Sequence, residues 1–285
     1  TWGGDGLSFP RIQGADPCGE VVAFGPGVGS DLLGRRVLVD AWIRDPDNPG
    51  DRDRACYLGS ERDGGFAQFC SVPAVNVHPV DSSFSDVELA SFPCSWSTAE
   101  HMLTRSRLRA GETVVVTGAS GGVGTALVQL AKLRAARVIA VTGAAKAGAV
   151  TALGADAVVD RAVSDLAGAV AEAAGGPVDV LADVVGGPAF ARLLEVVRRG
   201  GRYTTAGAIA GPMVDLDLRT LYLNDLEFHG CTVYDPAVFE ALVGHIERGE
   251  VRPVVGGTFP LADIWVAQEA FLAKAHVGAL VLIVD

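Results

Sequence analysis

The sequence lacks an excess of positive charge and long apolar runs. Its 285 residues include 23 Lys and Arg but 34 Asp and Glu, which gives a net charge of −11. Non-specific binding to nucleic acid depends on a basic surface, so a nucleic-acid partner is not expected. No apolar run approaches the roughly 18 residues of a membrane span, so no membrane association is expected either. Residues 1–5 contain neither the basic nor the apolar segment that would predict a signal peptide.

Cysteine is scarce, and no two cysteines form a C-x-x-C pair. The count of five is odd, so we expect no disulfide framework and favour a reduced, cytoplasmic location. Aromatic residues make up a modest 7% of the chain, whereas glycine is abundant, with 36 residues. This composition suits a chain that is rich in glycine-turned βα units.

The first hundred residues resemble β-structure, and a different pattern follows them. Short apolar or alternating runs at 21–24, 36–39 and 66–72 predict strands. Residues 44–54 are charged and rich in turn formers, which predicts an exposed loop. At roughly 100–200 residues per domain, the length predicts about two domains.

Strands and helices alternate after about residue 100. Apolar runs and helical spacing predict strands at 113–117, 137–141, 157–159, 178–182 and 202–206, and helices at 125–135, 149–153, 166–174 and 190–198. This alternation predicts an α/β fold with a doubly wound parallel sheet. Residues 227–234 and 280–284 are strand-like, and residues 239–248 are helical.

A glycine-rich turn follows the strand at 113–117 directly. Residues 117–124 read T-G-A-S-G-G-V-G and lead into a helix. Glycine lets the backbone approach a pyrophosphate, and the start of a helix offers free N–H groups and partial positive charge. The sequence therefore predicts a dinucleotide site whose contacts are Ser120, Gly121, Gly122, Val123 and Gly124. The alternative is an ordinary βα turn that holds several glycines.

The end of the second strand indicates which nucleotide is bound. An NAD site favours Asp or Glu there, to hold the ribose 2′-hydroxyl. This chain has the neutral Thr142, and Lys146 follows four residues later. A hydroxyl and an ammonium would hold a 2′-phosphate, so NADP(H) is the predicted cofactor. The alternative for Lys146 is a solvated loop lysine.

Several motifs together resemble the medium-chain dehydrogenase/reductase superfamily, and most closely its zinc-independent quinone oxidoreductase-like and alcohol dehydrogenase-like members. The motifs lie at 14–28, 64–69, 92–100, 118–124, 153–156, 183–187, 200–207, 253–263 and 276–280, and so cover nearly all of the chain. The resemblance implies a Rossmann domain with a doubly wound parallel sheet, inserted in a GroES-like β-rich catalytic domain. The implied boundaries are 1–97 for the first part of the catalytic domain, 98–251 for the NADP-binding domain and 252–285 for the catalytic return. Family members also have strands before the segment that begins this chain, and the resemblance implies that those strands are absent here.

The resemblance also bears on zinc. Zinc-dependent members have G-H-E where this chain has Gly14, Ala15 and Asp16, and alanine cannot bind a metal. Cys94 matches another family ligand, but a catalytic zinc needs three protein ligands. Cys56 is alone in the segment where some members hold a structural zinc on four cysteines. We therefore expect no metal, and the alternative role for Cys94 is that of a small buried apolar residue.

The family transfers hydride between nicotinamide and a carbonyl, quinone or activated alkene. The resemblance implies that Ser95 and Thr98 lie beside the nicotinamide, where their hydroxyls can stabilise charge on the substrate oxygen. An equally good alternative is that these hydroxyls cap the helix or bond to the backbone. Asp16 is expected near the cleft, where it orients a proton donor or only bonds to the backbone. Trp42, Trp96 and Tyr57 are candidate apolar walls for a substrate, or core residues.

Two further strand ends are expected at the cofactor. The resemblance implies that Val185, Gly186, Ala206 and Gly207 pass near its ribose and carboxamide. Arg161 follows the third strand and is expected to reach the adenine or the 2′-phosphate, its alternative being an exposed arginine.

The sequence as a whole predicts a zinc-free NADPH-dependent oxidoreductase that reduces a quinone, or an activated alkene or carbonyl. The alternatives are an alcohol dehydrogenase acting on aldehydes or ketones, and an NADPH-binding protein with little turnover. The expected partners are a small-molecule substrate and, by analogy with the family, a second copy of the chain paired through residues 227–234.

Overall fold

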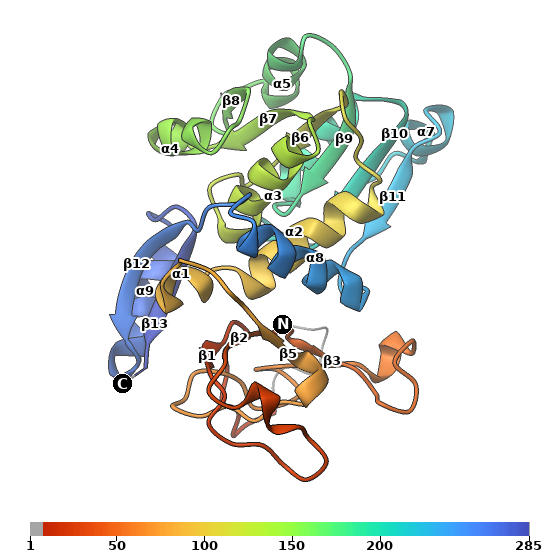
Figure 1. Ribbon diagram of the computed structural model, residues 1–285. Coiled ribbons are helices and arrows are strands. Elements are labelled where there is room, and N and C mark those ends of the chain that lie inside the picture. The colour runs from red at the N-terminus through yellow and green to blue at the C-terminus, as the bar shows by residue number, and fades with distance from the viewer. Residues whose placement is uncertain (1–7, 285) are drawn as a thin grey trace. The chain divides into compact units, whose positions relative to one another are not determined.

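The computed structural model describes residues 8–284, and their contacts divide the chain into two compact units (Figure 1). One unit consists of Thr1–Ser97 with Val233–Asp285, and the other of Thr98–Thr232. The second division therefore falls after Thr232, earlier than the residue 251 expected from the sequence. The role assigned to each segment stays a prediction.

The unit Thr98–Thr232 is built on a six-stranded parallel sheet. Its strands are β6 (Thr113–Val116), β7 (Arg137–Thr142), β8 (Ala157–Asp160), β9 (Val178–Asp183), β10 (Val197–Thr205) and β11 (Glu227–Gly230). They lie in the order β11-β10-β9-β6-β7-β8, and every neighbouring pair is parallel. This is the Rossmann strand order: from β6 the chain first adds β7 and β8 on one side, and then β9, β10 and β11 on the other, so the switch point lies between β6 and β9. The predicted doubly wound sheet is confirmed.

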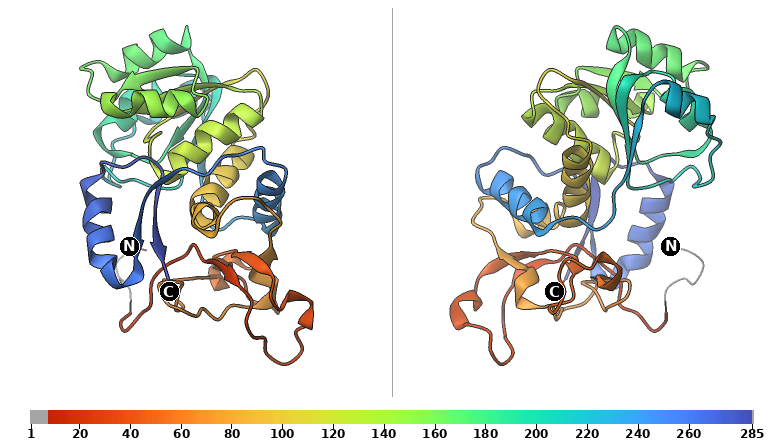
Figure 2. Two further views of the ribbon diagram at one scale, coloured as in Figure 1. Left: turned by 60° about the vertical axis from the view of Figure 1, so that its left-hand side comes forward. Right: turned by 90° about the vertical axis from the view of Figure 1, so that its right-hand side faces the viewer.

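Helices cover both faces of this sheet, as Figure 2 shows. They are α2 (Pro93–Arg105), whose first turn belongs to the other unit, α3 (Gly122–Leu133), α4 (Ala147–Ala152), α5 (Leu166–Ala174), α6 (Phe190–Leu194) and α7 (Leu218–Leu223). Val115 and Ile139 pack with Val170 of α5 and Phe190 of α6 in one buried cluster. Side chains alternate along a strand, so Val114 and its neighbours face the opposite side, where α3 packs on β6 and β7.

The other unit is rich in β-structure, as expected of a GroES-like domain. Its strands β1 (Cys18–Glu20), β2 (Arg36–Val39) and β5 (Val77–Pro79) form an antiparallel sheet in the order β1-β2-β5. Two further pairs are β3 (Trp42–Ile43) with β4 (Cys56–Tyr57), and β12 (Val255–Pro260) with β13 (Ala279–Ile283). Its helices are α1 (Asp86–Leu89), α8 (Pro236–Glu247) and α9 (Ile264–Ala273). Val39, Ala41, Ile43 and Leu58 form a buried cluster.

Short 3-10 turns complete the described elements of both units. They are η2 (Ser30–Leu32), η3 (Arg52–Arg54), η4 (Ala74–Asn76), η5 (Ala144–Lys146), η6 (Gly187–Ala189) and η7 (Leu261–Asp263). The loop predicted at 44–54 is largely exposed, and η3 begins inside it. Within residues 8–284, every helix is too short or too polar to span a bilayer.

Four of the predicted elements differ in the structure. The run at 66–72 is not a strand: the Phe66 N–H bonds to the Gln13 carbonyl at 2.8 Å, but the chain then bends through residues 65–68 instead of extending. The run at 21–24 lies just after β1, with Val22 exposed. The helix predicted at 190–198 ends at Leu194, and the strand predicted at 227–234 ends at Gly230.

Candidate nucleotide-binding and active site

The predicted glycine-rich turn connects β6 to α3. A Cβ added at Gly124 would lie 2.2 Å from the Gly118 carbonyl oxygen and 2.6 Å from the Ala119 Cα, so only glycine fits where the helix crosses the turn. Gly118 itself has a φ of +58°, in the left-handed region that glycine tolerates. The Ala119 N–H bonds to the Val141 carbonyl of β7 at 3.1 Å, which ties the turn to the next strand.

The first turn of α3 leaves backbone donors available for a ligand. Its N-cap is Gly121, which has no side chain to cap them, and the first helical bond runs from the Thr125 N–H to the Gly121 carbonyl at 2.8 Å. The N–H groups of Gly122, Val123 and Gly124 precede that bond. Ser120 lies beside them in the turn. A cradle that excludes a Cβ, followed by uncapped N–H groups, fits a pyrophosphate.

Two cations lie at the carboxyl end of β7, next to this turn. The Arg161 N–H bonds to the carbonyl of the buried Thr142 at 2.8 Å, and a Cβ at Gly143 would lie 3.8 Å from the Arg161 Nε. Partial burial, and then the charge of Arg161, lower the pKa of the Lys146 ammonium. Two cations that repel each other create a positive potential, so an anion placed there would be attracted by both.

The loops that follow β9 and β10 bond to each other. The Ala210 N–H bonds to the Val185 carbonyl at 2.9 Å, and the Gly187 N–H bonds to the Gly211 carbonyl at 3.1 Å. A Cβ at Gly207 would lie 3.5 Å from the Val184 carbonyl oxygen. The structure therefore brings together the predicted contacts Val185, Gly186, Ala206 and Gly207 at the carboxyl edge of the sheet. An apolar cavity of about 410 Å³ adjoins them and includes Phe190, Tyr203 and Phe228 in its lining.

The Asp183 carboxylate holds the loop after β9 in place, a role that the sequence does not predict. Its Oδ1 accepts hydrogen bonds from the Thr117 hydroxyl at 2.5 Å and from the Val185 N–H at 2.9 Å. Its Oδ2 accepts from the Tyr203 hydroxyl at 3.0 Å, and both oxygens accept from the Gly186 N–H. The side chain is 2% exposed. One buried carboxylate thus connects the ends of β6, β9 and β10.

We expect Asp183→Asn to lower the free energy of unfolding by about 2–3 kcal/mol, because an amide donor would face groups that are themselves donors. Urea denaturation measures this change. Asp225→Asn is the control, since Asp225 is exposed and should stay within about 0.5 kcal/mol. A variant of Asp183 as stable as the control would contradict the role of the carboxylate.

The β-rich unit holds a polar cluster at the start of α2. Asp16 Oδ1 accepts the Cys94 backbone N–H at 2.6 Å, and the Tyr57 hydroxyl donates to Cys94 Sγ at 2.8 Å. Burial, followed by the charges of Cys94 and Asp16, raises the pKa of the Tyr57 phenol, which therefore stays protonated. The ring of Tyr57 packs on that of Trp42 with centroids 4.7 Å apart. From the sequence, Tyr57 is a candidate apolar wall or core residue, and its hydrogen bond to Cys94 is a finding of the structure.

Ser95 and Thr98 lie on α2, and both residues are half-buried. Ser97, between them, donates to the Cys94 carbonyl at 3.2 Å. Among residues 8–284, the Ser95 and Thr98 hydroxyls have no such partner. Both hydroxyls therefore remain available as donors to a ligand, while the helix-capping contact comes from Asp16. Trp96, the third candidate wall, is a core residue at 1% exposure.

Asp16 gives the cluster a pH dependence. Desolvation raises the pKa of its carboxyl to about 6, outweighing the Cys94 N–H bond, although the side chain keeps access to water. The folded protein then holds this proton more tightly than the unfolded chain does. The protonated Asp16 therefore adds to the free energy of unfolding below pH 4, and this contribution is lost as the pH rises through 6. Relative to Asp16→Asn, which keeps the N–H acceptor, the native protein should lose stability between pH 4 and pH 7. Urea denaturation at the two pH values measures this difference, and a constant difference would contradict the raised pKa.

The donor set here does not fit a catalytic zinc. Ala15 has no ligand atom, and the Cys94 thiol already accepts a hydrogen bond from Tyr57. Residues 8–284 bring together no group of three His, Cys, Asp or Glu residues that could hold a metal ion. A catalytic zinc with three protein ligands cannot be built from these residues.

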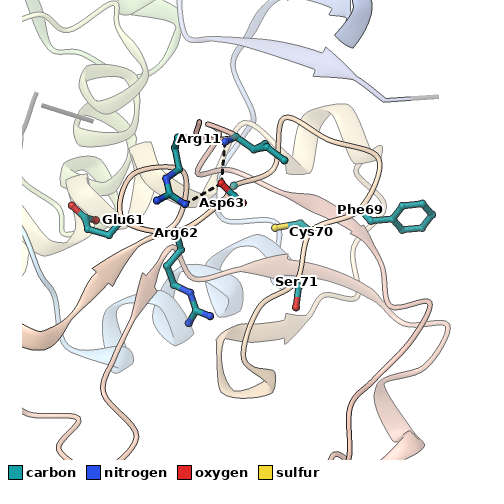
Figure 3. Close-up of a pocket in the computed structure, with 9 residues that line it drawn as sticks. Arg11, Glu61, Arg62, Asp63, Phe69, Cys70 and Ser71 are labelled. Carbon is teal, nitrogen blue, oxygen red and sulfur yellow. Dashed lines mark hydrogen bonds and ion pairs between the residues drawn. The ribbon is translucent and has the colours of Figure 1, made fainter. Parts of the chain in front are cut away.

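A second hollow of about 370 Å³ lies in the β-rich unit and is shown in Figure 3. Arg11 and Asp63 in its wall form an ion pair at 3.0 Å, and Glu61 accepts the Tyr57 N–H at 2.8 Å. Burial raises the pKa of the Cys70 thiol, so it is not an activated thiolate. The hollow contains none of the predicted site residues.

Two protein-family profiles match the chain. Residues 1–82 match the profile described as an alcohol dehydrogenase GroES-like domain, and residues 122–248 match the one described as a zinc-binding dehydrogenase. Among curated relatives, the acryloyl-coenzyme A reductase of Metallosphaera sedula is 31% identical over 97% of this chain and 84% of the relative. The quinone oxidoreductase of Rattus norvegicus is 25% identical over 97% of this chain and 80% of that protein.

Solved structures are similar over the same extent. A Sinorhizobium meliloti 1021 protein provisionally named an alcohol dehydrogenase is 52% identical, with a TM-score of 0.93 over 99% of this chain and 78% of its own. An NAD-dependent alcohol dehydrogenase is 29% identical, with a TM-score of 0.91 over 98% and 84%. The 2-octenoyl-CoA carboxylase reductase CinF, solved with NADP and 2-octenoyl-CoA, is 29% identical, with a TM-score of 0.89 over 95% and 68%.

Proposed function

The chain belongs to the medium-chain dehydrogenase/reductase superfamily and is an NAD(P)-dependent oxidoreductase, and on this premise we propose that it uses NADPH to reduce an activated alkene without zinc. The observation that carries the choice of NADPH is the pair of cations, Lys146 and Arg161, beside the neutral Thr142. The similarity to reductases of acryloyl-CoA and 2-octenoyl-CoA supports an alkene conjugated to a carbonyl as the substrate class.

The residues of the Rossmann unit would hold the cofactor in three parts. The N–H groups at the start of α3 would bind the pyrophosphate. Lys146 and Arg161 would bind the 2′-phosphate, with the Thr142 hydroxyl beside them. The loops at Val185–Gly186 and Ala206–Gly207 would border the nicotinamide ribose and carboxamide. When bound, NADPH supplies the hydride.

The residues of α2 would act on the substrate. Hydride transfer to a conjugated alkene places negative charge on the carbonyl oxygen, and the unpartnered hydroxyls of Ser95 and Thr98 would donate hydrogen bonds to that oxygen. Asp16 would hold the first turn of α2 through the Cys94 N–H. Its raised pKa also lets it hold a proton near pH 6.

The test is NADPH oxidation at 340 nm with acryloyl-CoA, 1,4-benzoquinone and propanal as separate acceptors, before and after EDTA. We expect fastest oxidation with acryloyl-CoA and no loss with EDTA. Reduction of propanal alone, lost with EDTA and restored by zinc, would instead support an alcohol dehydrogenase, which the similarity to the Sinorhizobium meliloti protein favours as the second candidate. NADPH binding without oxidation by any acceptor would identify a binding protein and contradict the proposal.

We also propose that two copies of the chain pair through β11. This strand lies at the edge of the sheet and is bonded to β10 alone within the described residues. Exposed apolar side chains nearby in the sequence include Met213, Leu218, Tyr222 and Leu223. An open strand edge with apolar neighbours favours association. Light scattering should give the mass of a dimer, and a monomer at micromolar concentration would contradict the pairing.

A further inference from the structure

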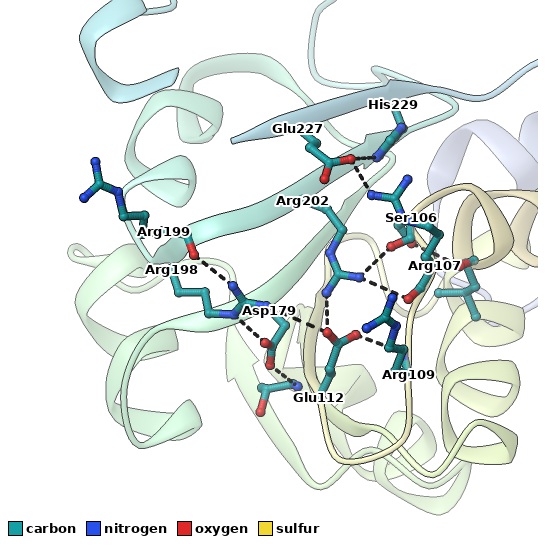
Figure 4. Close-up of polar contacts among 12 residues, drawn as sticks. Ser106, Arg107, Arg109, Glu112, Asp179, Arg198, Arg199, Arg202, Glu227 and His229 are labelled. Atoms are coloured by element: carbon teal, nitrogen blue, oxygen red, sulfur yellow. Dashed lines mark hydrogen bonds and ion pairs between the residues drawn. The ribbon is translucent and has the colours of Figure 1, made fainter. Parts of the chain in front are cut away.

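Two side chains on one face of β10 contact the backbone of α2 and of Ser106, the residue that follows it. Arg202 donates to the Ser106 carbonyl at 2.8 Å, as Figure 4 shows, and the Thr204 hydroxyl donates to the Met102 carbonyl at 3.5 Å. Arg202 is 5% exposed and Thr204 is fully buried. Both contacts therefore lie in the interior, where they fix α2 against the strand.

The two contacts advance in step along the two elements. Two residues of a strand span about 6.6 Å. Four residues of a helix span about 6 Å. Moving from Arg202 to Thr204 on β10 matches moving back from Ser106, just past the end of α2, to Met102 within it, so the two elements run in opposite directions. One further step of the same spacing leads from Thr204 to Ala206, just past the end of β10, and from Met102 to Thr98 on α2.

Further bonds hold the first of these contacts rigidly. Arg202 also donates to the Arg107 carbonyl at 3.0 Å and to Glu112 Oε1 at 2.5 Å. The other oxygen of Glu112 accepts the Arg109 N–H at 2.9 Å, which fixes the loop after α2 (Figure 4). The buried Thr204 hydroxyl additionally contacts Cys231 Sγ at 3.3 Å. The helix thus has one anchored end, and its position along β10 is set from there.

We propose that Arg202 and Thr204 are positioning residues for hydride transfer, because they set where α2 holds the Thr98 hydroxyl relative to the carboxyl end of β10. This inference rests on the proposed function, in which that hydroxyl donates to the substrate oxygen. Neither residue contacts the reacting atoms. A misplacement of about 1 Å at a reacting centre lowers the rate by about 100-fold, so loss of the register should affect catalysis more than binding.

The test compares kcat, KM and the primary deuterium isotope effect for acryloyl-CoA and NADPH in Arg202→Lys, Thr204→Val and Thr204→Ser. We expect Arg202→Lys to lower kcat by roughly 10- to 100-fold with a larger isotope effect. The dissociation constant for NADPH, read from its fluorescence, should stay within about twofold because the α3 and β7 contacts are unchanged. Thr204→Val should lower kcat, and Thr204→Ser, which keeps the hydroxyl, should restore it.

The matched control is Arg199→Lys, since Arg199 is also on β10 but is exposed and paired with Asp225. It should leave every constant unchanged. If the Arg202 and Thr204 variants behave like this control while Thr98→Val lowers kcat, the inference is overturned and the proposed function stands. Equal loss of NADPH affinity and kcat would also overturn it, because that result indicates general unfolding of the unit.

Thr98→Val separates the two hypotheses. If it leaves kcat unchanged in the native background, the proposed role of Thr98 fails, and the inference fails with it. If it lowers kcat in the native background but has little further effect in Arg202→Lys, the two residues act through one geometry, as the inference requires. If the two substitutions lower kcat independently, so that their fold-changes multiply in the double variant, the coupling between Thr98 and Arg202 is overturned.

Discussion

Gly124→Ala should abolish measurable NADPH binding and destabilise the Rossmann unit. The added methyl group would lie 2.2 Å from the Gly118 carbonyl oxygen and 2.6 Å from the Ala119 Cα, and both are backbone atoms that cannot rotate away. Relief requires α3 to move off the turn, which separates its uncapped N–H groups from the place where a pyrophosphate would lie. Overpacking of this kind costs about 1–3 kcal/mol in stability. Fluorescence titration with NADPH and urea denaturation measure the two effects.

The control for this prediction is Gly148→Ala. Gly148 is also a helical glycine of the Rossmann unit, in α4, but nothing lies within 4 Å of the position of its Cβ. Alanine is favoured over glycine inside a helix, so this variant should be neutral or more stable by about 0.5–1 kcal/mol, with NADPH binding intact. Native NADPH affinity in Gly124→Ala would show that the turn does not cradle the nucleotide.

The features of the Rossmann unit that could be predicted from the sequence are local ones. The turn at 117–124 is such a case, because strand, glycines and helix follow one another within a few residues. The parallel direction of the strands also follows from the alternation of strands and helices in the chain, whereas their order in the sheet does not. The run at 66–72 was wrongly predicted as a strand because alternation alone does not show which segment supplies the backbone partners. Here the start of the run, Phe66, bonds to a distant segment, at Gln13, and residues 67–72 form no strand.

The site residues that the sequence analysis missed act through partners that are distant in the chain. Tyr57 donates to Cys94 across 37 positions, and Asp183 accepts from Thr117 across 66. Nothing adjacent to Tyr57 or Asp183 in the sequence identifies those partners. The D183-V-V-G-G187 motif indicated that the segment was important, but it indicated backbone contacts rather than the carboxylate that orders them. The pairing of Arg202 with α2 is equally long-range, so it required coordinates.

Lys146→Ala combined with Thr142→Asp should reverse the nucleotide preference. Loss of the ammonium removes one charge-assisted hydrogen bond to a 2′-phosphate, worth about 1.5–3 kcal/mol. That energy corresponds to roughly 10- to 100-fold in affinity. The new carboxylate would repel the phosphate and accept a hydrogen bond from the 2′-hydroxyl of NADH. We expect the ratio of kcat/KM for NADPH to that for NADH to fall by at least 100-fold, part of it as a gain with NADH.

Arg161→Ala alone should lower the same ratio about tenfold, because the guanidinium beside Gly143 would be lost and one of the two charges that attract the 2′-phosphate would go with it. Arg192→Ala is the control, since this exposed arginine of α6 carries the same charge and pairs only with Glu195 among the described residues. The NADPH affinity of the native protein should also weaken with added salt more than that of the double variant, because the double variant removes one of the two attracting cations and adds a carboxylate, and so leaves less net attraction to be screened. An unchanged NADPH-to-NADH ratio in the double variant would refute the phosphate site at the end of β7.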